Sequence, residues 1–350
     1  MHDIAIGGRL IGPSHPPFII AELSGNHSQN FELAIAMVEA AAEAGAHAIK
    51  LQTYTADSMT LNVDSVDFVI QEKDSLWHGE ALHGLYAKAC TPYEWHSRLF
   101  ARAKELGMEA FSSPFDEGAV DFLETLEVPC YKVASFELTD IPLIRKAAAT
   151  GKPLIMSTGM ATLGEIEDAI ECAKKAGCQD IILLKCTSTY PAEPSNTNLV
   201  TIPHLQDAFN TQVGLSDHTA GIGVSIASVA LGATVIEKHF VLDRNAGGVD
   251  AAFSLEPDEL KSLVQESERG FAAMGEVTYG GSAAEEKSKH YRRSIFVSAD
   301  VQQGQVLTRD NLRIVRPASG LAPKHWDSVL GKVAKQDLPA GTALSWELFE

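Results

Sequence analysis

Eight short apolar segments alternate with stretches of helical spacing between residues 18 and 274, and this alternation restricts the possible folds more than any other feature of the chain. Strands that alternate with helices pair in parallel, because each helix carries the chain back to the end of the sheet where the next strand begins. The predicted strands are residues 18–22, 48–52, 109–113, 130–134, 154–157, 181–185, 213–218 and 234–239. The predicted helices include 31–44, 91–106, 117–126, 141–149, 162–176, 222–231 and 257–274.

This order of elements predicts an α/β fold, a closed (β/α)8 TIM barrel over residues 1–275. An open doubly wound sheet is the alternative, but it would want a glycine-rich fingerprint after the first strand. The chain reads Ser24-Gly25-Asn26-His27 there instead. Residues 53–90 interrupt the alternation, and an interruption of this length predicts a lid or rim over a site.

The end of the chain has a different character. Residues 276–289 are rich in Gly, Ser and Glu without an apolar period, which predicts a linker. Beyond it, the segments beginning at Val301 and Leu338 share one spacing of Gly and apolar residues, so we expect a pseudo-twofold, mostly β domain over residues 290–350. Because this domain is small, we expect it to lean on the barrel or on another subunit.

The composition excludes some partners. The net charge is -18, from 46 acidic and 28 basic residues, which argues against binding to nucleic acid but leaves room for a small anionic ligand. The chain has no basic region followed by an apolar one at its amino end and no apolar run near 18 residues, so we expect a soluble, cytoplasmic protein without a membrane partner. The five cysteines lack a Cys-x-x-Cys pair and are interpreted as reduced packing residues: Cys90, Cys130, Cys172, Cys178 and Cys186.

Two consecutive predicted strands each end in a histidine. His218 and His239 would meet at one edge, because carboxyl ends of neighbouring parallel strands lie roughly 5 Å apart. Two imidazoles at one rim could hold a divalent metal ion with most coordination positions open. The adjacent carboxylates of Asp217 and Glu237 could orient the two rings. The alternative is a pair of hydrogen-bonded structural histidines.

The chemistry of TIM barrels is carried at the carboxyl ends of the strands. That rule selects a set of polar side chains before any family is considered: Glu22, Lys50, Gln52, Ser113, Lys132, Ser157, Tyr190, Ser216, His218, Glu237 and His239.

Strand alternation points Lys50 and Lys132 into the barrel, and a buried ammonium needs a partner. With Ser135, Ser157 and Ser216, the two lysines suit a phosphate or a carboxylate. Salt bridges to Glu22 or Glu137 are the structural alternative. Lys132 could also act as the nucleophile of a Schiff-base aldolase. Lys238 points outward and is interpreted as structural.

Seven ordered motifs resemble those of the sialic acid synthase family. They lie at residues 20–27, 49–53, 113–115, 131–137, 157–160, 215–219 and 237–240, and include Tyr131-Lys132-Val133-Ala134-Ser135-Phe136-Glu137. The tail, through Arg292-Arg293-Ser294 and Arg316-Pro317, resembles the antifreeze-like (SAF, β-clip) domain of those synthases. The family condenses phosphoenolpyruvate with an N-acetylated amino hexose and releases phosphate by carbon–oxygen cleavage, giving nine-carbon 2-keto acids.

The resemblance implies a role for each matching residue. His218 and His239 would bind Mn²⁺ or Mg²⁺, and Glu22, Glu137 and Lys132 would be catalytic. The implied substrate-binding residues are Lys50, Gln52, Ser113, Phe115, Ser135, Ser157, Ser188, Tyr190, Ser216, Asp250 and Arg316. Ser188 stands where many family members have asparagine, which is consistent with a different sugar. The resemblance also implies a homodimer in which the SAF domain covers the partner's barrel. A lysine-imine lyase and a non-catalytic sugar-binding module are the competing interpretations.

Overall fold

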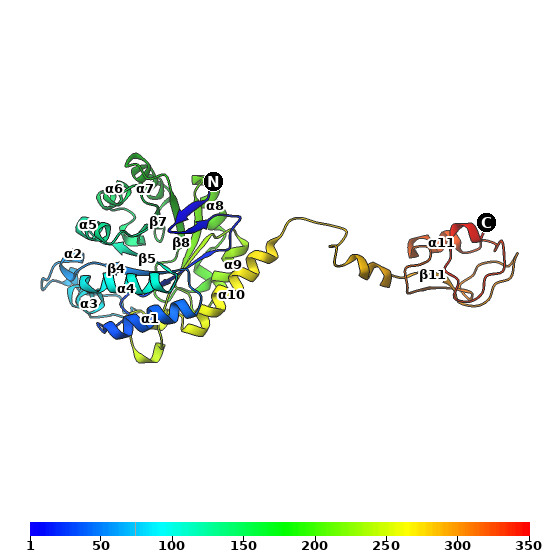
Figure 1. Ribbon diagram of the computed structural model, residues 1–350, viewed down its shortest axis with the longest axis horizontal. Helices are drawn as coiled ribbons and strands as arrows, with labels where there is room; N and C mark the ends of the chain where they lie inside the picture. Colours follow the sequence, from blue (N-terminus) through cyan, green and yellow to red (C-terminus); the bar gives the residue numbers. More distant parts are fainter. Residues whose placement is uncertain (74) are drawn as a thin grey trace. The chain divides into compact units, whose positions relative to one another are not determined.

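The first of two compact units, Met1–Gly275, contains a closed barrel of eight parallel strands enclosed by helices (Figure 1). The computed structural model describes residues 1–73 and 75–350. The barrel strands are β3 (Phe18–Glu22), β4 (Ala48–Thr53), β5 (Glu109–Pro114), β6 (Tyr131–Val133), β7 (Leu154–Ser157), β8 (Ile181–Cys186), β9 (Gln212–Asp217) and β10 (Val235–His239). Because β10 pairs with β3 and closes the ring, the predicted TIM barrel is confirmed and the open sheet is excluded.

Helices connect the strands and bury their apolar faces against them. They are α1 (Phe31–Glu43), α4 (Tyr93–Glu105), α5 (Glu117–Thr125), α6 (Ile141–Ala148), α7 (Leu163–Lys175), α8 (Thr201–Phe209), α9 (Gly223–Ala230) and α10 (Pro257–Met274). Asn30, Asp116, Asp140 and Thr162 begin four of them, and each side chain accepts a hydrogen bond from a first-turn N–H. The helices predicted from spacing agree with these bounds to within two residues at each end.

An amino-terminal hairpin was not predicted. β1 (Ile4–Ile6) and β2 (Arg9–Ile11) pair in antiparallel fashion, and their three isoleucines are buried in the barrel core. Gly7, at φ +56°, makes the turn, and Gly8 N donates a hydrogen bond to Glu109 Oε1 at 3.1 Å. The Gly-Gly pair between alternating isoleucines is the turn signal that sequence reasoning overlooked.

The interruption after β4 folds into α2 (Ala56–Met59), η1 (Val66–Phe68) and α3 (Leu82–Ala89). Between the last two, Val69 bridges Ala81, Ile70 N donates to Glu80 O at 3.0 Å, and Gly79 N donates to Ile70 O at 2.9 Å. These bonds make a hairpin-like turn of residues 69–73 and 75–81, which we call the rim flap.

The second unit, Glu276–Glu350, has its own small apolar core, including Ile295, Val297 and Leu344. It contains η6 (Glu286–Tyr291), the antiparallel pair β11 (Ser294–Val297) and β12 (Leu312–Val315), and α11 (Trp326–Val329). The two repeated segments pair with each other through an antiparallel bridge between Val301 and Leu338. Among the described residues of both units, no helix has the length and apolar character needed to cross a membrane.

Three buried histidines make the stability of the barrel dependent on pH. Burial lowers the pKa values of His27, His47 and His96 to about 4, and Ile19 N donates to His47 Nδ1 at 2.9 Å, which requires the unprotonated ring. In the unfolded chain the histidines protonate near pH 6.5, so the folded state loses stability as pH falls from 6.5 to 4, by about 3 kcal/mol per histidine.

We expect the free energy of unfolding, measured with urea, to fall steeply between pH 6.5 and 4. His47→Gln should remove about one third of this loss, because two of the three histidines remain, and the exposed His204→Gln should leave it unchanged. A wild type whose stability did not depend on pH would contradict the prediction.

Candidate active site

The register of the barrel places the predicted catalytic side chains next to one another. His239 pairs with Glu22 across β10 and β3, Glu22 with Lys50 across β3 and β4, and Glu237 with Ser216 across β10 and β9. Glu22 and His239 are the last residues of β3 and β10, whereas Lys50 and Glu237 lie further inside the barrel, in the middle of β4 and β10.

Two buried lysines share one carboxylate. Lys50 forms an ion pair with Glu22, and its Nζ lies 3.8 Å from Glu237 Oε2. Lys132 Nζ lies 3.1 Å from Glu237 Oε1, which also accepts a hydrogen bond from Ser216 Oγ at 3.1 Å. Glu237 therefore joins the two lysines. The expectation that Glu237 orients His239 is wrong, because inward residues two apart on a strand lie roughly 6.6 Å apart.

The expectation that Asp217 orients His218 is also wrong. Asp217 Oδ2 lies 3.1 Å from Lys238 Nζ and accepts a hydrogen bond from Ser225 Oγ at 2.6 Å, while Oδ1 accepts one from Thr219 N at 2.9 Å. Neighbouring residues of a strand point to opposite faces, so Asp217 faces the helices while His218 faces the barrel mouth. Its partner Lys238 is fully buried and structural.

The two histidine rings lie edge to face, with centroids 5.2 Å apart and an interplanar angle of 61°. His218 Nδ1 donates a hydrogen bond to Thr187 O at 3.0 Å, which fixes the tautomer and leaves Nε2 as a possible metal ligand. His239 Nδ1 is buried without a hydrogen-bond partner among the described residues and lies 3.7 Å from Asp250 Oδ2. Burial, with His218 and the nearby lysines, holds the pKa of His239 well below its usual range, so the ring is neutral.

These histidines fit a catalytic metal ion rather than a structural one. Over residues 1–73 and 75–350, no group of three or more His, Cys, Asp and Glu side chains is arranged to hold a metal. Two imidazoles with a free ring nitrogen would leave the other coordination positions to substrate or water, as open catalytic sites do.

Two further carboxyls can handle protons. Glu22 Oε1 accepts hydrogen bonds from Ser24 N at 3.0 Å and from Gln52 Nε2 at 3.2 Å, and burial raises its pKa although Lys50 opposes the shift. Glu137, in η2 (Ser135–Glu137), has a buried Oε2 without a hydrogen-bond partner in the described part of the chain. Burial raises its pKa to about 7, partly opposed by Lys132, so this carboxyl can bind or release a proton near neutral pH.

The hydroxyls of Ser135, predicted to bind phosphate, and Ser188, predicted to contact the sugar, both lie beside Gly159. Gly159 N donates to Ser135 Oγ at 3.2 Å, and a Cβ at position 159 would lie 2.7 Å from that hydroxyl and overlap the hydroxyl of Ser188. Ser157 Oγ is buried with no hydrogen-bond partner in the residues described. Ser113 accepts a hydrogen bond from Lys50 Nζ at 3.3 Å. The hydroxyl of Ser157 is therefore free to bind a ligand.

The remaining predicted residues fall into two groups. Tyr190 packs on His218 at 4.6 Å, and Asp250 accepts a hydrogen bond from Ser24, so both border the histidine pair. Phe115 instead packs edge-on against Tyr54 at 5.2 Å, at the base of the flap region. Arg316 follows β12 in the second unit, so its contact with a sugar stays a prediction.

Sequence reasoning missed one residue at the site. Cys186 ends β8, and its Sγ lies 3.8 Å from His218 Nδ1 and 3.7 Å from Ser188 Oγ. Burial tends to raise its pKa, but the contact with His218 lowers it to about 6. All five cysteines lie in the described residues and are free thiols. The rim rule, applied to the last residue of β8, would have found Cys186.

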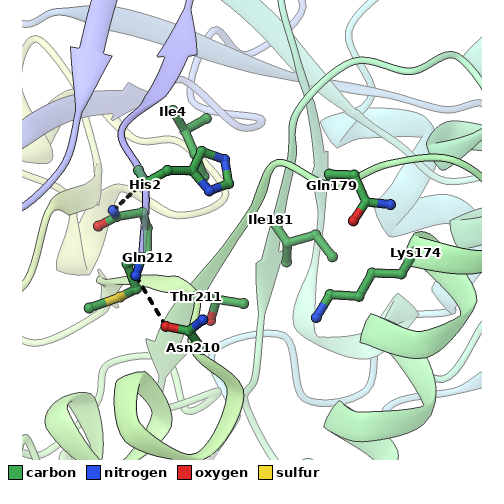
Figure 2. A pocket seen from close by; sticks show the side chains of 9 residues that line it. His2, Ile4, Lys174, Gln179, Ile181, Asn210, Thr211 and Gln212 are labelled. Atoms are coloured by element: carbon green, nitrogen blue, oxygen red, sulfur yellow. Dashed lines mark hydrogen bonds between the residues drawn. The ribbon is translucent and has the colours of Figure 1, made fainter.

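A separate cavity lies at the opposite, amino end of the barrel (Figure 2). It measures about 180 Å³ and is lined by residues that include His2, Ile181, Thr211 and Gln212, the last of which donates to His2 O at 2.8 Å. None of the predicted site residues lines it, so it is distinct from the candidate active site.

Comparisons with known proteins agree with this geometry. The model of the NeuB family matches residues 37–279, and the model of the SAF domain matches residues 292–350. The chain is 44% identical to a pseudaminic acid synthase of Helicobacter pylori, covering 94% of this chain and 97% of that protein. It is 38% identical to an N,N'-diacetyllegionaminic acid synthase of Campylobacter jejuni, covering 91% and 96%. A solved N-acetylneuraminic acid synthetase from Leptospira borgpetersenii superposes with a TM-score of 0.73 at 33% identity, covering 83% of this chain and 96% of that one.

Proposed function

This chain belongs to the NeuB family, and on that premise we propose that it is a pseudaminic acid synthase, condensing phosphoenolpyruvate with 2,4-diacetamido-2,4,6-trideoxy-altropyranose. Within the family, the higher identity to a pseudaminic acid synthase, 44% against 38% for an N,N'-diacetyllegionaminic acid synthase, favours this sugar. The observation that carries the synthase proposal is the pair Lys50 and Lys132 bridged by Glu237 beside the two histidines. Legionaminic or N-acetylneuraminic acid synthesis is the alternative.

The two lysines would bind the anionic substrate. Phosphoenolpyruvate entering between Lys50 and Lys132 would take over part of their pairing with Glu237, and Ser135, Ser157 and Ser216 would donate hydrogen bonds to its oxygens. Charge-assisted hydrogen bonds in a buried site are strong enough to offset the loss of hydration of such an anion.

A lysine imine is disfavoured by the same contacts. Lys132 Nζ lies 3.1 Å from Glu237 Oε1, and attack on a carbonyl carbon to form an imine would have to break this contact. Borohydride in the cold would trap an imine if one formed, so a substrate-dependent covalent adduct would favour the lyase over the synthase.

The histidine pair would hold the metal ion on which NeuB-family synthases generally depend, and we propose Mn²⁺ or Mg²⁺. When bound, that ion would polarise the open-chain aldehyde of the sugar. Carbon 3 of the enol would bond to the aldehyde carbon, and the aldehyde oxygen would take up a proton. Water would then add at carbon 2, and phosphate would leave with the carbon–oxygen bonding pair. Glu22 and Glu137 would stabilise the cation at carbon 2 and accept the proton of the water.

Measuring turnover with three candidate sugars tests this proposal directly. We expect phosphate release to require both phosphoenolpyruvate and metal ion. Among three sugars, it should be fastest with the altro-configured diacetamido sugar, and slower with the diacetamido sugar that is the precursor of legionaminic acid and with N-acetylmannosamine. Mass spectrometry and NMR identify the nine-carbon product. Faster turnover of either competing sugar would overturn the proposed substrate, and sugar binding without turnover would favour a binding module.

We further propose a homodimer in which the second unit of one protomer covers the barrel mouth of its partner. At the carboxyl rim, Phe136, Met160 and Leu163 are exposed to solvent (60%, 63% and 54%). Exposed apolar side chains of this kind are typical of a surface that contacts another protein domain. The acidic surplus of the chain lies almost entirely in residues 1–275, so the tail is close to neutral and can approach the barrel.

Removal of residues 276–350 is expected to leave a folded barrel with little synthase activity. The barrel has its own core, so circular dichroism should change little while turnover falls, because Arg316 and the cover are lost. Mixing sharpens the test: Arg316→Ala and His218→Ala proteins, each weakly active alone, should regain part of the activity when subunits exchange, because one intact barrel would meet one intact tail. An active truncated monomer, or no recovery on mixing, would refute the cover.

A further inference from the structure

The rim flap carries one large aromatic residue toward the site. Trp77 lies in the turn of the flap, where Glu80 N donates to Trp77 O at 3.0 Å. Its Nε1 donates a hydrogen bond to Val249 O at 3.2 Å, a residue 172 positions along the chain. The indole therefore ties the flap to the segment that follows β10.

That segment borders the histidine pair. Gly247 and Gly248, at φ +89° and +140°, bend the chain before Asp250, whose N–H donates to Asn26 Oδ1 at 3.0 Å. Phe253 follows in η5 (Ala251–Phe253) and packs on His239 with centroids 4.9 Å apart. The hydrogen bond from Trp77 to Val249 therefore connects the flap to the segment that carries Asp250 and Phe253.

The same indole also reaches the other side of the site. The Trp77 ring lies 6.0 Å from that of Tyr190, which packs on His218 at 4.6 Å and on Phe253 at 5.4 Å. Trp77, Tyr190 and Phe253 form an aromatic wall around the two histidines. Trp77 is only half-buried, so part of its surface stays available to a ligand.

We propose that Trp77 determines sugar specificity, by presenting an apolar surface to the methyl groups of the sugar bound at the histidine pair. This inference rests on the proposed function. The proposed substrate carries a methyl group at carbon 6 and a second acetamido group, whereas N-acetylmannosamine carries a hydroxymethyl group and a hydroxyl. Burial of methyl groups against an aromatic face makes binding more favourable, whereas a hydroxyl placed there would lose its hydrogen bonds to water.

The test compares kcat/KM for the two sugars in four full-length proteins: wild type, Trp77→Ala, Trp77→Phe and Leu76→Ala. Leu76 is the exposed neighbour on the flap, so its variant controls for disturbance of the turn. For Trp77→Ala we expect the ratio of kcat/KM between the diacetamido sugar and N-acetylmannosamine to fall by about tenfold to a hundredfold. The KM for phosphoenolpyruvate should change little, because the contacts of Trp77 among the described residues are to Val249 and Tyr190 and not to the two lysines.

The phenylalanine variant distinguishes two roles of Trp77: an apolar surface for the sugar, and a hydrogen bond that holds the flap to Val249. Trp77→Phe keeps an aromatic face but loses the bond to Val249, so it should retain most of the wild-type ratio. If kcat/KM fell equally for both sugars in Trp77→Ala, or if Trp77→Phe were as impaired as Trp77→Ala, Trp77 would serve only to hold the flap in place. Either result would overturn the inference. A wild type that prefers N-acetylmannosamine would refute the proposed substrate, while the change of ratio on substitution still decides the role of Trp77.

Discussion

Alanine at His218 or His239 is expected to lower kcat about a thousandfold or more while the protein stays folded. Loss of a Lewis acid from a developing alkoxide removes several kcal/mol of transition-state stabilisation, and each 1.36 kcal/mol is a factor of ten. The fold should persist because few polar contacts are lost: His239 Nδ1 has no hydrogen-bond partner among the described residues, and His218 Nδ1 contacts Thr187 O, in a loop, and Cys186 Sγ. Turnover at saturating metal ion measures the effect.

Metal binding provides the readout that activity alone cannot. Calorimetric titration with Mn²⁺ should show binding to the wild type that either variant loses, and chelation should inactivate the wild type reversibly. His204→Ala, at an exposed position on α8, is the matched control and should keep both binding and turnover. Full activity of His218→Ala or His239→Ala after chelation would show that the two rings serve only as packing and hydrogen-bonding groups.

The sequence is informative wherever strand parity decides the answer. Eight apolar segments predicted the barrel, and alternation predicted that Lys50 and Lys132 face inward while Lys238 faces outward. The ion pair of Lys238 with Asp217 was found only in the structure. Local periodicity carries this information because every second residue of a strand shares one face.

Contacts across the barrel could not be derived in the same way. Glu237 reaches Lys132, which lies 105 residues away on a strand that does not pair with β10, so the contact exists only once eight strands have closed at a fixed tilt. Assigning Glu237 to its sequence neighbour His239 failed for this reason. The bond from Trp77 to Val249 likewise depends on the fold of a flap without a regular period.

The Glu237 bridge leads to the second large effect, the substitution Lys132→Met. Methionine resembles the lysine stem in length but removes one cation from the buried carboxylate of Glu237, which keeps Ser216 Oγ at 3.1 Å and Lys50 Nζ at 3.8 Å. Breaking one partner of a buried pair costs about 3 kcal/mol or more of stability, and losing a phosphate-binding ammonium should lower kcat/KM for phosphoenolpyruvate about a thousandfold. Lys146→Met, which removes a surface partner of Asp121, should change little.

A second substitution separates stability from function. Adding Glu237→Gln to Lys132→Met removes the unpaired charge, so the free energy of unfolding should return most of the way to the wild-type value, as it does when both members of a buried pair are neutralised together. Activity should not return, because the ammonium that binds phosphoenolpyruvate is still missing. If activity recovered with stability, Lys132 would be a structural partner of Glu237 and not a substrate-binding residue. If neither recovered, the bridge between Lys50 and Lys132 would not be the interaction that holds this side of the barrel together.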